Sequence, residues 1–367
     1  MNAASVVLFR KAWEETRAGL RRPAGEREKY IGYFCTYTPR EIIHAAGFIP
    51  VRVEGGTSFP QEADALTPGF ICPFLRTALD AGLRGEYRGL RGLVQGYTCD
   101  AACGVLNIWR ENIGAEVFHS LPLPYNDNAD SRLFLRRALE ELIGKLKTAG
   151  GRYTDESLEN SLALYGRIRE LSLSLAGRRD MFSASDFNEI IRAGFVVPPE
   201  KYVVLLEKLA TATDGDKPAA REGTPILVSG GLIEDPRVWE LVEACGAVVA
   251  ADDLCGGMRS FHPPFGAGDD PLGRLMDRHF KRRPCPVRAR ALERVEDLIA
   301  SARESGARGV VVFAQKFCTP QLADFPIIRE KLNAAGLPAL LLEMEETEPA
   351  GEGMRGRLRT FLEIIGG

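Results

Sequence analysis

Short apolar runs recur in the first third of the chain, and each is bounded by glycine, proline or charged residues. Three of these runs have the length of buried strands, at residues 47–53, 92–97 and 116–122. The stretches at 39–46 and 106–112 carry apolar residues at helical spacing. Strands and helices that alternate at this length predict a parallel, doubly wound sheet.

The middle of the chain has a different pattern. Between about residues 131 and 211, apolar positions follow helical periodicity over long stretches, for example 133–147 and 156–175. No strong strand candidate interrupts these stretches. This part of the chain is therefore predicted to be a helical connector.

The last third returns to the alternation of strands and helices. Candidate strands lie at 226–231, 247–253, 309–313 and 339–343, and candidate helices at 236–245, 295–305, 325–335 and 357–365. A chain of 367 residues exceeds the size at which a single core stops growing. We predict an α/β fold with two doubly wound parallel-sheet domains of Rossmann or flavodoxin type, residues 1–130 and 221–367, and a helical connecting region, residues 131–220.

Charge and hydropathy exclude several classes of function. The formal net charge is −3, and basic residues are scattered, so the sequence has no electrostatic footprint for nucleic acid. No apolar run approaches the roughly 20 residues that span a bilayer, so no membrane partner is expected. Charges interrupt the apolar part of residues 1–22 early, unlike a signal peptide. We expect a cytoplasmic protein.

Two nucleotide-binding motifs are excluded by their context or their absence. Residues 351–356 match GxGxxG, but they do not directly follow a strand and only one helix remains after them, so no βαβ unit is completed. The sequence contains no GxxxxGK[ST], so the chain itself should not be an ATPase.

The eight cysteines need a role other than disulfides in a reducing compartment. No CxxC occurs, which disfavours local zinc and dithiol sites. Cys99, Cys255 and Cys318 each follow a predicted strand, and Cys72 precedes Pro73, which suits the last residue before a helix. Cys245, inside a predicted helix, is interpreted as a small buried side chain. For the loop cysteines, spacing leaves burial and metal ligation equally open.

Iron–sulfur chemistry would suit such a set of thiolates, because soft sulfur ligands stabilise iron in mixed valence states. A four-iron cluster that only carries electrons uses four protein ligands. With three ligands, one iron keeps an open position for a substrate.

Four blocks of sequence resemble the 2-hydroxyacyl-CoA dehydratase family, which also contains benzoyl-CoA reductase subunits. They are IGYFCTYTPREIIHAAGFIPVRVEG at 31–55, CPFLRTALDAGLRGEYRGLRGLVQGYTCD at 72–100, SGGLIEDPRVWELVEACGAVVAADDLCGGMR at 229–259 and GVVVFAQKFCTPQLADFPIIREKL at 309–332. The blocks span most of the chain in the order of the family.

The resemblance implies an oxygen-sensitive enzyme subunit in which Cys72, Cys99 and Cys318 hold a [4Fe-4S] cluster. It implies a low-potential electron that dehydrates a 2-hydroxyacyl-CoA, or reduces an aromatic acyl-CoA, through a ketyl radical. It also implies two partners: a homologous second subunit, or a second copy of the chain, and a separate ATP-dependent iron–sulfur activator. Glu41 becomes a candidate catalytic residue in the substrate cleft, although its ordinary role would be to complement a helix N-terminus.

Two alternatives stay open at this point. A subgroup that resembles this family carries a double-cubane cluster and needs more thiolates, which Cys35, Cys103 and Cys255 could supply in a stand-alone homodimeric reductase of small molecules. The chain could also be a non-catalytic two-lobed binding or scaffold protein with buried cysteines. The acyl group, the choice between dehydration and ring reduction, and the choice between homodimer and heterodimer are open as well.

Overall fold

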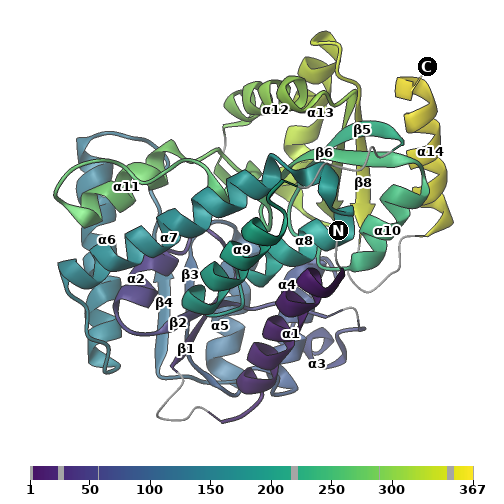
Figure 1. Ribbon diagram of the computed structural model, residues 1–367. Coiled ribbons are helices and arrows are strands. Elements are labelled where there is room, and N and C mark those ends of the chain that lie inside the picture. Colours follow the sequence, from purple (N-terminus) through teal and green to yellow (C-terminus); the bar gives the residue numbers. More distant parts are fainter. Residues whose placement is uncertain are drawn as a thin grey trace.

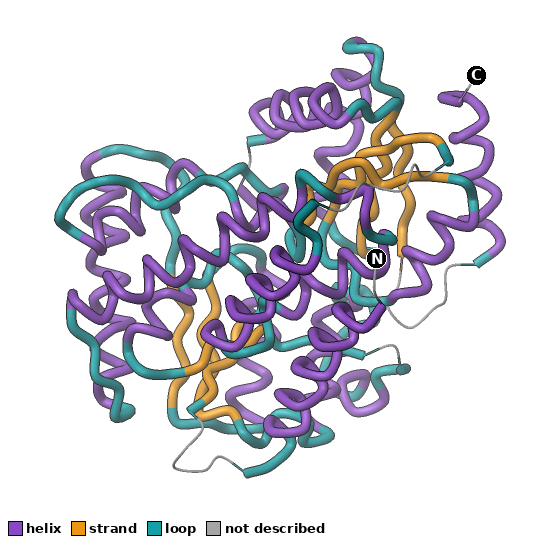
Figure 2. Tube along the Cα trace, in the orientation of Figure 1, coloured by secondary structure: helices purple, strands orange, loops and turns teal. Residues whose placement is uncertain are grey.

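The structure is a computed structural model, and it describes residues 3–23, 29–56, 58–215, 222–288, 290–344 and 351–366. Two four-stranded sheets lie at separate ends of the molecule, and long helices run between them (Figures 1 and 2). Both sheets are entirely parallel, which confirms the predicted α/β class.

The N-terminal lobe contains the sheet β2-β1-β3-β4. Its strands are β1 (Tyr30–Tyr33), β2 (Ile49–Arg52), β3 (Leu90–Gly96) and β4 (Val117–Leu121), and its helices are α2 (Arg40–Ala45), α3 (Gln61–Asp64), α4 (Pro73–Leu83) and α5 (Asp100–Asn112). The three predicted strands are confirmed as β2, β3 and β4. The central strand β1 was not predicted, because four residues with a glycine among them form too short an apolar run.

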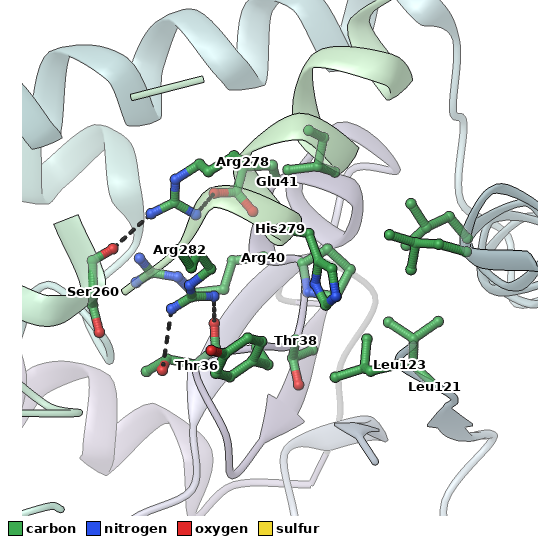
Figure 3. Close-up of a pocket in the computed structure, with 15 residues that line it drawn as sticks. Thr36, Thr38, Arg40, Glu41, Leu121, Leu123, Ser260, Arg278, His279 and Arg282 are labelled. Atoms are coloured by element: carbon green, nitrogen blue, oxygen red, sulfur yellow. Dashed lines mark hydrogen bonds and ion pairs between the residues drawn. The ribbon is translucent and has the colours of Figure 1, made fainter. Parts of the chain in front are cut away.

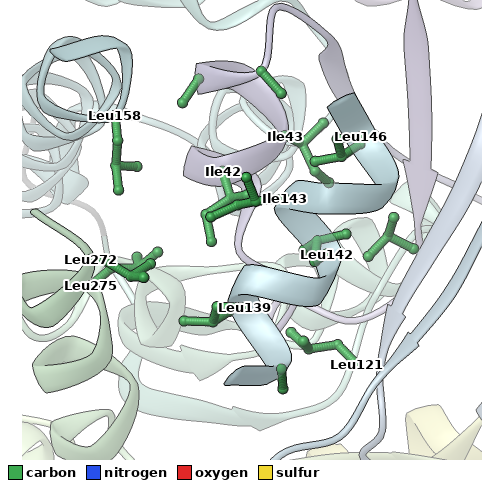
Figure 4. Packing of buried hydrophobic residues seen from close by; sticks show 14 of the residues in the cluster. Ile42, Ile43, Leu121, Leu139, Leu142, Ile143, Leu146, Leu158, Leu272 and Leu275 are labelled. Atoms are coloured by element: carbon green, nitrogen blue, oxygen red, sulfur yellow. The ribbon is translucent and has the colours of Figure 1, made fainter. Parts of the chain in front are cut away.

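Helices cover both faces of this sheet. On one face, apolar side chains of α4 and α5 pack against Val51 and Leu93. On the other face, α2 and α6 (Ala129–Thr148) pack against Ile31 and Val94. Figure 4 shows that leucines and isoleucines of α2 and α6 meet Leu272 and Leu275, which belong to α11 (Pro271–Lys281). Residues far apart in the chain therefore share one core.

The C-terminal lobe contains the sheet β6-β5-β7-β8. Its strands are β5 (Thr224–Gly230), β6 (Ala247–Leu254), β7 (Gly309–Gln315) and β8 (Ala339–Met344), and its helices are α10 (Pro236–Ala244), α12 (Ala291–Ser305), α13 (Thr319–Ala334) and α14 (Glu352–Gly366). Val311 faces the core under α10 and α14, whereas Val310 and Val312 face α12 and α13. Burial on both faces explains why each strand of this lobe contains a continuous apolar run, and all four predicted strands are confirmed.

Helices α6, α7 (Asp155–Ala176), α8 (Ala184–Ala193) and α9 (Pro199–Ala212) occupy the predicted helical region. Side chains of Asn128, Thr154 and Ser183 cap the first turns of α6, α7 and α8. The N-terminal helix α1 (Ala3–Leu20) packs on α8 and α9. The domain boundaries near residues 130 and 220 stay a prediction. No helix in the described ranges is both long enough and apolar enough to cross a bilayer.

A buried ion network joins the two lobes through Glu54, which follows β2 and is 0% exposed. Its carboxylate accepts hydrogen bonds from Arg52 at 2.7 Å, from Arg192 of α8 at 2.9 Å and from Trp13 of α1 at 3.0 Å. Arg192 also donates to the backbone carbonyl of Glu234, just after β5, at 2.7 Å. One carboxylate thus connects β2, α1, α8 and, through Arg192, the loop after β5.

We expect Glu54→Gln to destabilise the protein by about 3–5 kcal/mol at pH 7, because it leaves buried guanidinium groups without their counter-charge. Burial alone would raise the pKa of Glu54, but Arg192 and Arg52 lower it to about 2. The unfolded value is about 4.3, so the contribution of these ion pairs is complete above about pH 4.3 and is lost as the pH falls through about 2. Urea unfolding at pH 7 and pH 3 measures both effects.

The matched control is Glu189→Gln, which breaks a solvent-exposed pair with Arg10 and should cost less than about 1 kcal/mol. An equal loss for Glu54→Gln at pH 7 and pH 3 would contradict the role given to the ionised carboxylate.

Candidate functional site

A cavity of about 150 Å³ lies where the carboxyl ends of strands from both sheets approach each other. Its lining comes from the ends of β1, β3, β5, β6 and β7 and the segments that follow them, together with the start of α4 and residues 285–287. In parallel sheets, ligands bind at this end of the strands. We call it the cysteine cavity, because six of its lining residues are cysteines: Cys35, Cys72, Cys99, Cys255, Cys285 and Cys318.

The three cysteines implied as cluster ligands line this cavity, and each directly precedes a helix. Cys72, Cys99 and Cys318 are the N-cap residues of α4, α5 and α13. Burial raises the pKa of each thiol, and nearby backbone N–H groups of the first turn partly offset this rise. The helix N-terminus adds a partial positive charge. Three separate helices therefore direct donors at sulfur atoms that face one space.

Cys318 depends on an unusual backbone conformation at the preceding residue. Phe317 has a φ of +64°, in the left-handed region that residues other than glycine, asparagine and aspartate rarely adopt. The turn lets the N–H of Cys318 bond to the carbonyl of Gln315, the last residue of β7. Strain of this kind is typical of functional sites, and here it places Cys318 beside the end of its strand.

Burial has the largest effect on the pKa values of these thiols. It raises the pKa of Cys72 to about 12 and that of Cys285 to about 11, and it also raises the pKa of Cys35, Cys99 and Cys318. Neighbouring sulfurs add to this rise, since each thiolate disfavours ionisation of the next. Without a positive charge in the cavity, these thiols are neutral.

The effects of the sulfurs on one another's pKa values link the six cysteines in two overlapping groups. Cys72, Cys99 and Cys318 form one set, in which neighbouring thiols raise the pKa of Cys72 and Cys318. The pKa of Cys35 responds to Cys255 and Cys285. Cys255 also raises the pKa of Cys99 and Cys318, so it belongs to both groups.

The donor set fits an iron–sulfur cluster better than a single ion. Among the described residues, no three His, Cys, Asp or Glu side chains converge closely enough to hold one metal ion. A multi-iron cluster separates its thiolate ligands by its own width, and the cavity between these sulfurs provides that space. Phe34, Phe74, Leu75 and Leu232 make much of the wall apolar, which suits a cofactor that is kept from water.

Arg259 also lines the cavity, but its charge is already balanced. It donates to both carboxylate oxygens of Asp253, at 2.8 and 2.7 Å, and all of these groups are buried. Arg76 does not line the cavity and instead pairs with Asp64.

Glu41 does not line the cysteine cavity. It is buried at the start of α2, and one of its oxygens lies 3.7 Å from Nη1 of Arg278 in a neighbouring pocket (Figure 3). Its proposed catalytic role stays a prediction.

Two further cysteines lie outside the cavity. Cys103 occupies α5 one turn beyond Cys99, and Cys245 packs in the core beside α14. Sequence reasoning missed Cys285, which lies in a loop before a short 3₁₀ helix, Pro286–Arg288. The one sequence feature that indicated it is the Cys285-Pro286 dipeptide, which matches Cys72-Pro73.

Comparison with known proteins gives a consistent result. The model of a family described as "2-hydroxyglutaryl-CoA dehydratase, D-component" matches residues 35–365. The (R)-phenyllactyl-CoA dehydratase beta subunit of Clostridium sporogenes is 24% identical, over 92% of each chain. One of the benzoyl-CoA reductase subunits of Thauera aromatica is 24% identical over 100% of this chain and 99% of its own. The (R)-2-hydroxyglutaryl-CoA dehydratase subunit beta of Acidaminococcus fermentans is 23% identical over 99% of this chain and 99% of its own.

In the metal-free, reduced protein, we expect the alkylation rate of Cys72 to rise about tenfold per pH unit from pH 7 to 9.5. The reason is that a pKa of about 12 keeps the thiolate fraction small throughout this range. In the urea-unfolded chain, the same rate should level off above about pH 8.5. Iodoacetamide labelling with peptide mass spectrometry measures both, and a plateau near pH 9 in the folded protein would show that Cys72 is not buried as described.

Proposed function

The chain belongs to the 2-hydroxyglutaryl-CoA dehydratase D-component family, and we propose that it is a subunit of an oxygen-sensitive [4Fe-4S] enzyme acting on an acyl-CoA. The reaction would be dehydration of a 2-hydroxyacyl-CoA or reduction of an aromatic acyl-CoA. Relatives named as dehydratase and reductase subunits, matched over nearly their whole length, support this activity. The observation that carries the proposal is the convergence of three N-cap cysteines from distant segments on one apolar cavity.

In this proposal Cys72, Cys99 and Cys318 hold the cluster. The N–H groups of three helix first turns would stabilise their thiolates, and the cluster's iron would supply the positive charge that the buried sulfurs need. Three protein ligands leave one iron with an open position.

The reaction explains why such a cofactor is needed. Water is hard to remove from a 2-hydroxyacyl thioester, because its β-hydrogen is weakly acidic and hydroxide is a poor leaving group. When bound, the cluster would supply a low-potential electron to the thioester carbonyl. The resulting ketyl radical anion would expel the adjacent hydroxide and leave a radical with a far more acidic β-hydrogen. Loss of that proton and return of the electron would complete the dehydration. The apolar wall formed by residues such as Phe34 and Leu232 would keep water away from the radical.

Two partners are proposed. The sequence has no P-loop, so the ATP-dependent step would belong to a separate activator protein. The second partner is a homologous subunit or another copy of this chain, in line with relatives that are themselves named as subunits. Phe70, Tyr97 and Phe317 are 68%, 48% and 41% exposed, and each lies one or two residues before a proposed ligand. Exposed aromatic side chains next to the proposed ligands suit a site that another protein covers.

A second candidate is a homodimeric reductase of small molecules with a double-cubane cluster. The observation that favours it is the second set of three cavity cysteines, Cys35, Cys255 and Cys285. Cys103, which sequence reasoning put in this set, does not line the cavity, whereas Cys285 does.

Iron and acid-labile sulfide per chain, measured after anaerobic purification, should be about four of each for a single cluster. Serine variants of Cys72, Cys99 and Cys318 should each lose most of the iron, because a hydroxyl is a poor substitute for a thiolate. Cys245→Ser is the matched control, since this cysteine lies in a separate core, and it should keep the wild-type content.

The same series separates the two candidates. About eight iron per chain, with losses in serine variants of Cys35, Cys255 and Cys285 as well, would favour the double-cubane reductase. No iron after attempted reconstitution would leave a binding or scaffold protein. Circular dichroism of each variant distinguishes loss of ligands from loss of fold.

The proposed need for an activator leads to a second prediction, about turnover. Under a mild reductant the purified chain, with or without its partner subunit, should not turn over acyl-CoA until activator and ATP are added. Turnover is measured as formation of the enoyl product. Turnover without ATP would contradict this part of the proposal.

A further inference from the structure

A second pocket has no lining residue in common with the cysteine cavity. It has a volume of about 30 Å³ and lies between the segment that follows β1, the start of α2 and the helix α11 (Figure 3). We call it the arginine pocket, because Arg40, Arg278 and Arg282 line it. Among the described residues of its lining, Glu41 is the one acidic side chain. The pocket therefore collects positive charge in a small space.

The charges around the arginine pocket do not balance. Arg40 and Arg282 are 8% and 9% exposed, and neither forms an ion pair with a residue in the described ranges. Arg278 approaches the carboxylate of Glu41 only to 3.7 Å, which is longer than a hydrogen bond. Three guanidinium groups thus face one carboxylate. Because charges without counter-charges are costly to remove from water, a further anion is expected here.

Backbone carbonyls satisfy part of the hydrogen-bonding capacity of these arginines but none of the charge. Arg278 donates to the carbonyls of Ser260 at 2.6 Å and Pro263 at 3.1 Å. Arg282 donates to the carbonyl of Thr36 at 2.6 Å. These bonds hold the guanidinium groups in place without neutralising them, so the positive pocket is built before any ligand arrives.

Two further observations indicate that an anion is missing. Burial and the neighbouring Arg282 lower the pKa of Arg278 to about 9 in spite of Glu41. Burial, Arg288 and Arg282 lower the pKa of His279 to about 3, and its buried Nε2 finds no hydrogen-bond partner among the described residues. An anion in the pocket would raise both pKa values, and Nε2 of a protonated His279 could then donate to it.

We propose that the arginine pocket binds a small monovalent anion, of the size of chloride or formate, as the counter-ion of its guanidinium groups. A volume of about 30 Å³ holds roughly two water-sized groups, so it accommodates a chloride ion or the two oxygens of formate but not an anion as large as phosphate. Guanidinium groups bind such anions through charged hydrogen bonds. The bound anion would connect α11 to α2 and to the segment that follows β1. This site is independent of the acyl-CoA chemistry proposed above.

The first test is isothermal titration calorimetry on the wild-type protein, purified anaerobically and dialysed against sodium gluconate, whose anion is too large for the pocket. We expect chloride and formate each to bind saturably at one site per chain, and phosphate to bind at least about tenfold more weakly because of its size. No saturable binding of chloride or formate would overturn the inference. Phosphate binding as tight as that of formate would also overturn it, since the pocket would then not select a small monovalent anion.

The second test assigns the binding to Arg278. Arg278→Gln should weaken formate binding roughly 10- to 100-fold, the loss typical of one charged hydrogen bond. Arg278→Lys should retain part of the affinity, because it keeps the charge but loses the fork. The matched control is Arg274→Gln, one turn earlier on α11, whose side chain pairs with Glu159 and does not line the pocket. Unchanged formate affinity in Arg278→Gln would place the anion elsewhere and refute the assignment.

A third measurement, thermal unfolding followed by circular dichroism, covers the case in which a variant is less stable. At constant ionic strength, replacing gluconate by formate should raise the Tm of the wild type and of Arg274→Gln but not that of Arg278→Gln, because a ligand stabilises only the protein that binds it. An equal rise in all three proteins would be a general salt effect and would overturn the inference. None of these measurements uses the cluster or an acyl-CoA, so the failure of the proposed function would leave them interpretable.

Discussion

The ionised carboxylate of Glu54 is the interaction on which the relative position of the two lobes depends. It lies directly after an edge strand of one sheet and is shared between Arg52 and Arg192, and Arg192 continues to the loop after the central strand β5 of the other sheet. Buried charges of this kind require good geometry to offset the cost of removing them from water. A displacement of α8 would therefore break several charged hydrogen bonds at once, and the arrangement keeps the carboxyl ends of both sheets facing one cavity.

This arrangement explains why the cysteines can be so widely spaced in the sequence. A cavity between two parallel sheets receives one loop from each strand that ends there, and each of these loops can contribute a thiol. Three of the loops run directly into helices, so the same local structure presents sulfur and backbone N–H groups together. The ligands for a cluster are thus provided by the topology rather than by a compact sequence motif.

The alternation of apolar runs and amphipathic stretches was sufficient to predict two parallel sheets, because strand and helix periodicity are local properties of the chain. It was also sufficient to place Cys72, Cys99 and Cys318 at the ends of strands or the starts of helices. The strand β1, the packing of α11 on α6 and α7, and the entry of Cys285 into the cavity could not be predicted, since they depend on contacts between residues far apart in the sequence. Glu41 is the clearest example: its motif is local, but only the position of Arg278, more than two hundred residues later, decides which pocket it faces.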